Sequence, residues 1–193
     1  MRYQAAMEAV LKRLRKELPR NLYYHSIEHT RDVLARVEEL AKNENLNEHD
    51  FQLLRVAACY HDAGFLINNR DHERLGCKIV RAELPQYDFS SEDIEKICGM
   101  IRATKVPQNP RNLPQKILCD ADLDYLGRKD FYRIGQRLFR ELKAYRILNT
   151  EAEWNRLQIN FLRRHQYWTE TNKLLRRPEK LARLAELEAK WEG

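Results

Sequence analysis

The stretch "AACYHDAGF" (57–65) joins two residues capable of acid–base and metal chemistry to an apolar run. His61 and Asp62 stand side by side directly after that run, and Gly64 then interrupts the helical pattern. Burying an imidazole beside a carboxylate costs free energy unless a hydrogen bond or a cation compensates it, and both groups are ligands for divalent metals. Adjacent side chains on a helix point about 100° apart. Both can therefore face one ion only where the helix ends, and Ala63 with Gly64 is expected to supply that end.

The stretch "YYHSIEHTRDV" (23–33) carries two more imidazoles. His25 and His29 are four residues apart, so we expect them to share one face of a helix. His29 also lies in line with Val33 and Val37 on the apolar stripe of that helix. An imidazole there is either a hydrogen-bonded core residue or a ligand, and the neighbouring motifs favour a ligand.

Three alternating carboxylates lie in the otherwise apolar stretch "ILCDADLDYLG" (117–127). We expect Asp120 to be a charge near a helix start and Asp124 to be exposed to solvent. Neither role suits Asp122, which follows Cys119 by three residues and so belongs to the apolar side of the helix. An ordinary structural role therefore does not explain Asp122 well.

In this order, His29, the pair His61–Asp62 and Asp122 resemble the H…HD…D signature of the HD-domain superfamily of metal-dependent phosphohydrolases. The resemblance covers about residues 22–127 and rests on "YHSIEH", "HDAGF" and "DADLDYLG". It implies an all-α fold and a metal held by His29, His61, Asp62 and Asp122. It also implies hydrolysis of phosphomonoesters or phosphodiesters, usually of nucleotides. A ligand set with two imidazoles suits Mn²⁺, Fe²⁺, Co²⁺, Ni²⁺ or Zn²⁺ better than Ca²⁺.

The same resemblance raises the question of a second ion. His72, in "DHERLG", stands where binuclear members of the superfamily keep a further ligand. Their next ligand is a histidine, whose place is taken here by Thr104. Because threonine is a poor ligand for a divalent metal, we expect one firmly held ion and a second ion that is weak or absent.

Catalytic roles follow from a second likeness. "YHSIEH" is similar to the "YHN-x-x-H" motif of cyclic-nucleotide phosphodiesterases, in which the first histidine protonates the leaving oxygen. That role falls here to His25, with Ser26 in place of the asparagine. Asp62 is suited to be both a ligand and the acceptor of a proton from metal-bound water. The candidate substrate-binding cations are Lys105, Arg102 and Arg70, although ordinary surface charge explains each of them as well.

Three other functions stay open. A degenerate nucleotide-binding or regulatory HD module would keep the ligands without turnover. A di-iron HD oxygenase would need a complete second site, against which Thr104 argues. Hydrolases of guanosine tetraphosphate alarmones follow the dyad with paired acidic residues, whereas Ala63, Gly64 and Phe65 follow it here.

The elements that must position these residues all read as helices. The chain has 193 residues, of which 43% are apolar and 33% charged, with only six glycines and six prolines. Helical stripes occur at about 30–41, 51–58, 75–84, 89–103, 117–126, 131–142 and 154–162, and after Pro178. The proline-rich stretch 106–114 is predicted to be a loop. We therefore predict a single all-α HD domain over 1–193, with a motif-bearing core at about 22–127 and a C-terminal helical extension at about 128–193.

Charge and cysteine usage suggest the partners and the compartment. The net charge of +6 suits a small anionic phosphorylated substrate. The late basic residues are mixed with acidic ones, so they do not form the clean basic face that nucleic-acid binding needs. The four cysteines lie far apart, and we expect buried reduced thiols in a cytoplasmic protein.

Two segments could serve either packing or an interface. The basic amphipathic N-terminus (1–20) is expected to pack on the domain rather than on a membrane, and no apolar run is long enough to span one. The C-terminal residues His165, Tyr167 and Trp168 are expected to pack in the core, with capping of the site or a homodimer surface as the alternatives.

Overall fold

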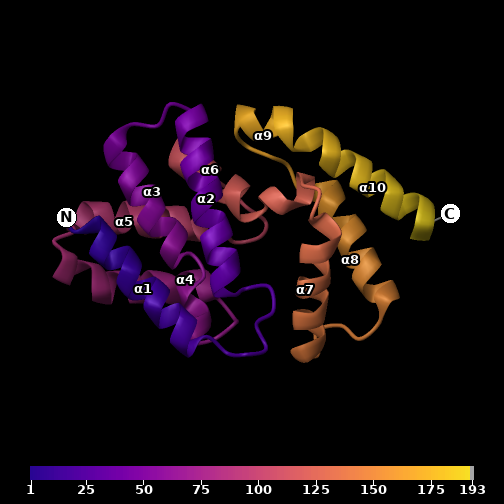
Figure 1. Ribbon diagram of the computed structural model, residues 1–193, viewed down its shortest axis with the longest axis horizontal. Coiled ribbons are helices and arrows are strands. Elements are labelled where there is room, and N and C mark those ends of the chain that lie inside the picture. Colours follow the sequence, from indigo (N-terminus) through magenta and orange to yellow (C-terminus); the bar gives the residue numbers. More distant parts are fainter. Residues whose placement is uncertain (192–193) are drawn as a thin grey trace.

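The computed structural model describes residues 1–191, in which helices are joined by loops and turns and no strand is present (Figure 1). The α-helices are α1 (Tyr3–Glu17), α2 (Ile27–Asn43), α3 (Glu48–Tyr60), α4 (His72–Glu83), α5 (Ser91–Ala103), α6 (Leu113–Asp122), α7 (Phe131–Ala144), α8 (Glu151–Arg164), α9 (Glu170–Leu175) and α10 (Arg177–Trp191). Short 3-10 helices are η1 (Ala63–Leu66), η2 (Leu84–Tyr87) and η3 (Asp124–Gly127). The all-α prediction is confirmed. The last two residues of the predicted extension, 192–193, lie outside the described residues.

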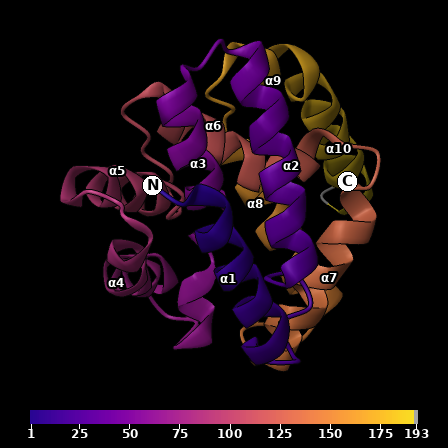
Figure 2. The same ribbon diagram turned by 60° about the vertical axis from the view of Figure 1, so that its left-hand side comes forward.

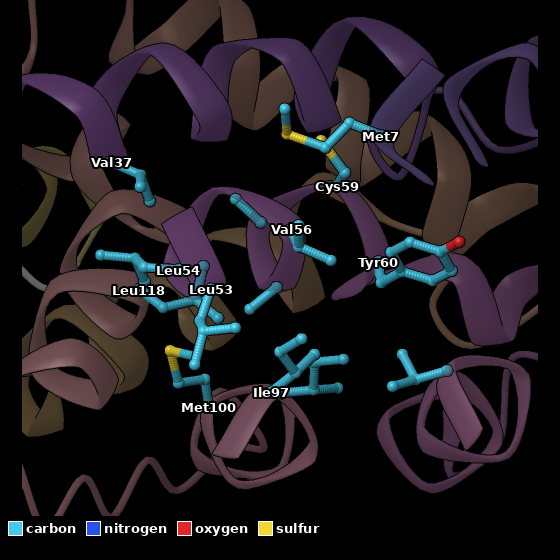
Figure 3. Packing of buried hydrophobic residues seen from close by; sticks show 14 of the residues in the cluster. Met7, Val37, Leu53, Leu54, Val56, Cys59, Tyr60, Ile97, Met100 and Leu118 are labelled. Atoms are coloured by element: carbon cyan, nitrogen blue, oxygen red, sulfur yellow. The ribbon is translucent and has the colours of Figure 1, made fainter. Parts of the chain in front are cut away.

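Helix α3 is the buried axis of the N-terminal half. Helices α1, α2, α5 and α6 all pack against it (Figure 2). Seven of its last eight residues are fully buried, with 0% of their surface exposed: Leu53, Leu54, Val56, Ala57, Ala58, Cys59 and Tyr60. Side chains from neighbouring helices, such as Met7, Val37 and Ile97, close around them (Figure 3). A helix enclosed on every side must be apolar all round, which explains the apolar run that leads into His61.

The N-terminal helix α1 packs on this core. It buries Ala6, Met7, Val10 and Leu14, and it contacts α3. This confirms packing on the domain as the role of its apolar stripe. No helix within residues 1–191 has both the length and the apolar character needed to cross a membrane. All four cysteines are buried free thiols.

The C-terminal helices lie beside the N-terminal half (Figure 1), and most residues of a second apolar cluster come from them and from η3. The buried residues of this cluster include Tyr125, Leu126, Phe131, Ile159 and Leu187. The last helix, α10, packs against α8 and η3 instead of projecting from the fold. The core role expected for Tyr167 is confirmed, because its ring is buried and its hydroxyl donates to the Leu123 carbonyl at 3.3 Å.

The end of α6 corrects two expectations about its carboxylates. Asp120 is fully buried and accepts hydrogen bonds from the backbone N–H groups of Trp168 and Thr169, each at 2.8 Å, and from the Thr169 hydroxyl at 2.6 Å. Asp124 is buried and accepts from Arg176 Nε at 2.8 Å. Neither is a surface charge, since donors from the C-terminal segment compensate their burial. Asp120 anchors that segment to α6, and Asp124 anchors it to η3.

Helix α6 also differs from prediction at both ends. It begins at Leu113, because the Asn112 side chain caps it by accepting from Gln115 N and because proline is tolerated in a first turn. The predicted loop is therefore two residues too long. The helix ends at Asp122, and the chain continues as η3 rather than as one helix to residue 126.

Any side chain larger than that of Gly64 is expected to destabilise the fold, because η1 passes close to the start of α4 at this residue. A Cβ atom there would lie 1.9 Å from the backbone oxygen of His72, which cannot rotate away. We expect Gly64→Ala to lower the free energy of unfolding by about 1–3 kcal/mol, measured by urea denaturation followed by circular dichroism.

Gly99→Ala is the matched control. The nearest atom to its Cβ would be the flexible Gln115 side chain at 3.3 Å. Since α5 is continuous there, alanine should be neutral or stabilising by about 0.5–1 kcal/mol. Equal stabilities of the two variants would contradict the close approach at Gly64.

Candidate metal centre

The C-terminal end of α3 presents His61 and Asp62 at one point. The helix ends at Tyr60, His61 keeps a helical backbone (φ −56°, ψ −40°), and Asp62 departs from it (φ −101°, ψ 6°). This departure lets two adjacent side chains turn toward the same place, as the sequence predicted from Ala63 and Gly64. Only 1% of the His61 side chain and 8% of the Asp62 side chain are exposed.

The first turn of α2 supplies a second imidazole. Ser26 is the N-cap of that helix, and its side chain accepts from the His29 backbone N–H. His29 therefore lies in the first turn and points inward, with 8% of its side chain exposed. His25 precedes the cap and is not part of the helix. The expectation that His25 and His29 share a helix face is wrong, because the cap falls between them.

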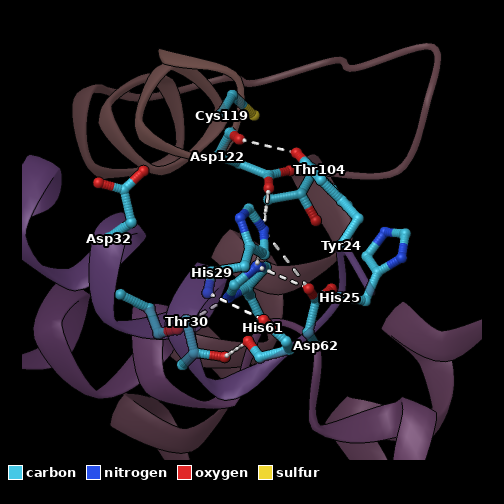
Figure 4. Close-up of polar contacts among 12 residues, drawn as sticks. Tyr24, His25, His29, Thr30, Asp32, His61, Asp62, Thr104, Cys119 and Asp122 are labelled. Atoms are coloured by element: carbon cyan, nitrogen blue, oxygen red, sulfur yellow. Dashed lines mark hydrogen bonds and ion pairs between the residues drawn. The ribbon is translucent and has the colours of Figure 1, made fainter. Parts of the chain in front are cut away.

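Four polar atoms from three helix ends converge here (Figure 4). The Nε2 atoms of His29 and His61 lie 3.3 Å apart. Asp122 Oδ1, at the end of α6, lies 3.1 Å from His29 Nε2 and 3.7 Å from His61 Nε2. Asp62 Oδ2 lies 3.5 Å and 3.2 Å from the same two nitrogens. The structure thus brings together His29, His61, Asp62 and Asp122, which we call the four-residue cluster.

The donor set of this cluster fits a divalent metal. His61 Nδ1 lies 2.8 Å from the Ala58 carbonyl, which can only accept, so in the neutral ring Nε2 carries a lone pair toward the cluster. Asp62 Oδ2 is buried and accepts no hydrogen bond, which leaves its charge for a cation to compensate. Ligand atoms about 2.0–2.1 Å from one ion stand about 3.0–3.4 Å apart. Most of the measured separations fall in or near that range.

The electrostatics of the cluster favour a positive charge at its centre. Burial disfavours the charged form of His61, but Asp62 and Asp122 outweigh burial and raise the pKa of His61 to about 9. Burial also opposes ionisation of Asp62, yet His61, His25 and His29 hold the pKa of its carboxyl well below the usual range. The metal-free cluster therefore favours a proton on His61, and a metal ion would replace that proton.

His72 lies against the outer oxygen of Asp62. Its Nε2 is 3.6 Å from Asp62 Oδ1 and 3.5 Å from Glu73 Oε1. Thr104 is buried nearby, but its hydroxyl donates to the Ile101 carbonyl at 2.8 Å. With that hydroxyl engaged, a weak or absent second ion stays the prediction.

A buried glutamate that sequence reasoning missed holds His25. Glu141, on α7, accepts from the backbone N–H groups of Tyr24 at 2.7 Å and His25 at 3.0 Å through Oε2. Its Oε1 accepts from His25 Nδ1. The His25 ring also stacks on Phe65, with 4.3 Å between centroids. Burial opposes the charged imidazole, but Glu141 and Asp62 raise its pKa above the ordinary value.

One sequence signal could have identified Glu141. It follows Ile134 and Leu138 at helical spacing and so lies on the apolar stripe of α7. An acidic residue in such a stripe needs a buried partner. The identity of that partner, 116 positions away along the chain, has no local signature.

A cavity of about 430 Å³, which we call the site cavity, opens beside Asp62, Asp122 and His25. Of the three predicted substrate-binding cations, only Lys105 lines it, and Lys105 Nζ pairs with Asp71 Oδ1 at 3.0 Å. Arg102 instead lies 3.8 Å from Glu95 on the outer surface of α5. Arg70 is exposed and does not line the cavity. The structure corrects the expectation for those two arginines, since neither side chain reaches the cavity.

Comparison with known proteins agrees with this geometry. A family model described as the HD domain matches residues 26–124, just over half of the chain, and this span contains the whole four-residue cluster. No curated protein sequence matches the chain.

Two crystal structures of other proteins have a fold similar to that of this chain. A protein from Lactobacillus plantarum is similar with a TM-score of 0.70 and 18% identity, over 100% of this chain and 99% of that one. A predicted HD superfamily hydrolase from an uncultured Thermotogales bacterium is similar with a TM-score of 0.62 and 22% identity, over 97% of this chain and 92% of that one.

Metal binding should release protons at neutral pH. Because the pKa of His61 is raised to about 9 in the metal-free protein, an incoming ion must displace its proton. Titration of the metal-stripped protein with Zn²⁺ at pH 7 should release about one proton per ion, and this release should decline as the pH rises through that pKa. Calorimetry in two buffers of different ionisation enthalpy measures the number of protons released.

His49→Ala, at the opposite end of α3, is the control and should release the same number of protons as the unchanged protein. A binding enthalpy that does not depend on the buffer at pH 7 would contradict the assignment of His61 as a ligand that loses a proton.

Glu141→Gln should lower the pKa of His25. The carboxylate of Glu141 favours the charged imidazole, and an uncharged amide removes that stabilisation while keeping a similar shape. NMR titration of the His25 ring gives the pKa directly. Glu95→Gln, in a surface pair with Arg81, is the control and should leave the curve in place. Identical His25 titration curves for both variants would rule out a direct influence of Glu141 on the pKa of His25.

Proposed function

Because the chain belongs to the HD domain family, we propose that it is a metal-dependent phosphohydrolase. In this proposal His29, His61, Asp62 and Asp122 hold one divalent ion, and Mn²⁺, Fe²⁺, Co²⁺, Ni²⁺ and Zn²⁺ suit two imidazoles and two carboxylates. The single observation that supports it most is that the Nε2 atoms of His29 and His61 each lie 3.1–3.7 Å from one oxygen of Asp62 and one of Asp122, although these residues are far apart along the chain.

The chemistry divides between the ion and the residues around it. A bound divalent ion lowers the pKa of water to about 7 and offsets charge on the phosphoryl group. Asp62 accepts the proton of the attacking water, whose oxygen forms the new bond to phosphorus. His25 gives a proton to the alcohol oxygen as the old phosphorus–oxygen bond breaks. Glu141 orients His25 by engaging Nδ1, which leaves Nε2 as the nitrogen available for that transfer.

The substrate in this proposal is a small phosphomonoester or phosphodiester, and the resemblance noted above favours a nucleotide. Lys105 is the lysine positioned to meet a phosphoryl group at the site cavity. Its pairing with Asp71 keeps the ammonium close to the cavity wall until an anion competes for it. The net charge of +6 agrees with an anionic substrate.

A metal analysis combined with a hydrolysis screen tests the proposal. The purified protein would receive each of the five divalent ions together with nucleoside monophosphates, nucleoside triphosphates, cyclic nucleotides and simple alkyl phosphates. We expect turnover of at least one ester with a transition metal. Asp122→Asn should lose the bound metal and the turnover together, because it removes one charged ligand.

Asp88→Asn is the matched control, since it makes the same change in an exposed pair with Arg2. It should keep metal and activity. Equal turnover by Asp122→Asn and the unchanged protein would overturn the proposal. Tight nucleotide binding without hydrolysis under any metal would instead support the regulatory alternative.

A further inference from the structure

The site cavity extends well beyond the residues that carry the chemistry. One end is lined by Asp62, Asp122 and His25, and the other by side chains of α7 and α8 from the C-terminal extension. Its volume of about 430 Å³ lies in the range of cavities that bind small molecules, about 300–1,000 Å³. The space is therefore large enough for a substrate portion that lies outside the reaction itself.

The far end of this cavity is apolar and rich in rings. Its walls are formed by Leu126, Phe131, Leu138, Trp154, Leu157 and Phe161. Trp154 also stacks on Phe139 at 5.6 Å, which holds its indole in place. Apolar cavities of this kind gain free energy by taking up apolar groups, because water inside them makes few hydrogen bonds.

Charge along the cavity argues against a polyphosphate. Within residues 1–191, Lys105 is the only lysine or arginine that lines it, and Lys105 already pairs with Asp71. Asp71 and Glu73 add two carboxylates to those of the four-residue cluster. Each further phosphate would bring charge that no lining cation matches, at a cost in desolvation and repulsion.

A neighbouring cavity of about 260 Å³ does not supply the missing charge. It shares Tyr24, Asp122 and Tyr125 with the site cavity as lining residues, and it is also lined by three arginines. Arg128 pairs with Asp32 at 2.8 Å, and Arg133 pairs with Asp130 at 2.9 Å. The third, Arg137, is exposed, so solvent and salt screen its charge.

We propose that the site cavity selects phosphate esters with one phosphoryl group and a bulky, apolar, ring-containing alcohol. The phosphoryl group would lie at the four-residue cluster, and the alcohol would lie between α7 and α8. This inference rests on the proposed function for the placement of the phosphoryl group. It assigns the C-terminal extension a direct part in substrate selection.

Binding of two phosphonates tests the inference without any turnover. Methylphosphonate and 1-naphthylmethylphosphonate carry the same anionic group and differ in the apolar ring. With protein loaded with Mn²⁺, calorimetry should show the naphthyl compound binding about tenfold tighter or more, from the apolar area it buries. Equal affinities would overturn the inference.

A pair of variants locates the effect. Leu157 is 43% exposed, so Leu157→Asp should fold while placing a carboxylate on the apolar wall. It should abolish the preference for the naphthyl compound, because a carboxylate on the wall disfavours an apolar ring. Leu181→Asp, at a 46% exposed position on α10 outside the cavity, should retain the preference. A preference retained in Leu157→Asp would show that the ring binds elsewhere.

Hydrolysis separates this inference from the proposed function. 1-Naphthylmethyl phosphate, glycerol phosphate, a nucleoside monophosphate and a nucleoside triphosphate would be compared at equal concentration. Faster turnover of the naphthyl ester supports both proposals. Equal turnover of all four keeps the phosphohydrolase and overturns the selectivity. No turnover, with the naphthyl preference in binding intact, overturns the phosphohydrolase and keeps the selectivity.

Discussion

Two carboxylates and two imidazoles meet where little water can reach them, and their charge has to be balanced inside the fold. The Asp62 carboxylate illustrates the constraint, because one of its oxygens is buried without a hydrogen bond. The four side chains converge on one point because they lie at helix ends rather than along helix faces. His29 lies in the first turn of α2, His61 caps α3, and Asp122 is the last residue of α6. Where the backbone leaves or enters a helix, neighbouring side chains can converge in ways that a regular helix forbids.

The cluster could be anticipated from sequence because three short motifs, each weak alone, together resemble the H…HD…D signature of a known superfamily, and local patterns agreed with it. His61 and Asp62 follow a fully apolar run, and His29 continues an apolar stripe. These signals report burial, and burial of ionisable groups implies a shared partner. The end of α3 at the dyad followed from Ala63 and Gly64 for the same local reason.

What could not be anticipated depends on contacts between distant segments. Asp120 and Asp124 look like ordinary surface charges until donors near Trp168 and Arg176 are placed beside them. Arg102 is close to Thr104 in sequence, yet the helix turns it toward Glu95 and away from the cavity. The separation of His25 from α2 depended on whether Ser26 or an earlier residue caps the helix, and local propensity does not decide that.

The C-terminal extension completes the site rather than covering it. Glu141 reaches from α7 to the backbone of Tyr24 and to the ring of His25, so the segment before α2 is held by a helix from the other half of the chain. Helices α7 and α8 also form the apolar end of the site cavity. The position of His25 and the walls of the site cavity therefore depend on the two halves packing together.

Asp122 stands between two buried carboxylates that hold the two ends of α9. Hydrogen bonds of 2.6–2.8 Å tie Asp120 to Thr169 and Asp124 to Arg176. Consecutive Cα atoms keep a fixed spacing of about 3.8 Å. A displacement of α9 that moves Asp120 and Asp124 therefore also moves Asp122, which lies between them in the chain. The position of the Asp122 carboxylate beside His29 and His61 therefore depends on where α9 packs.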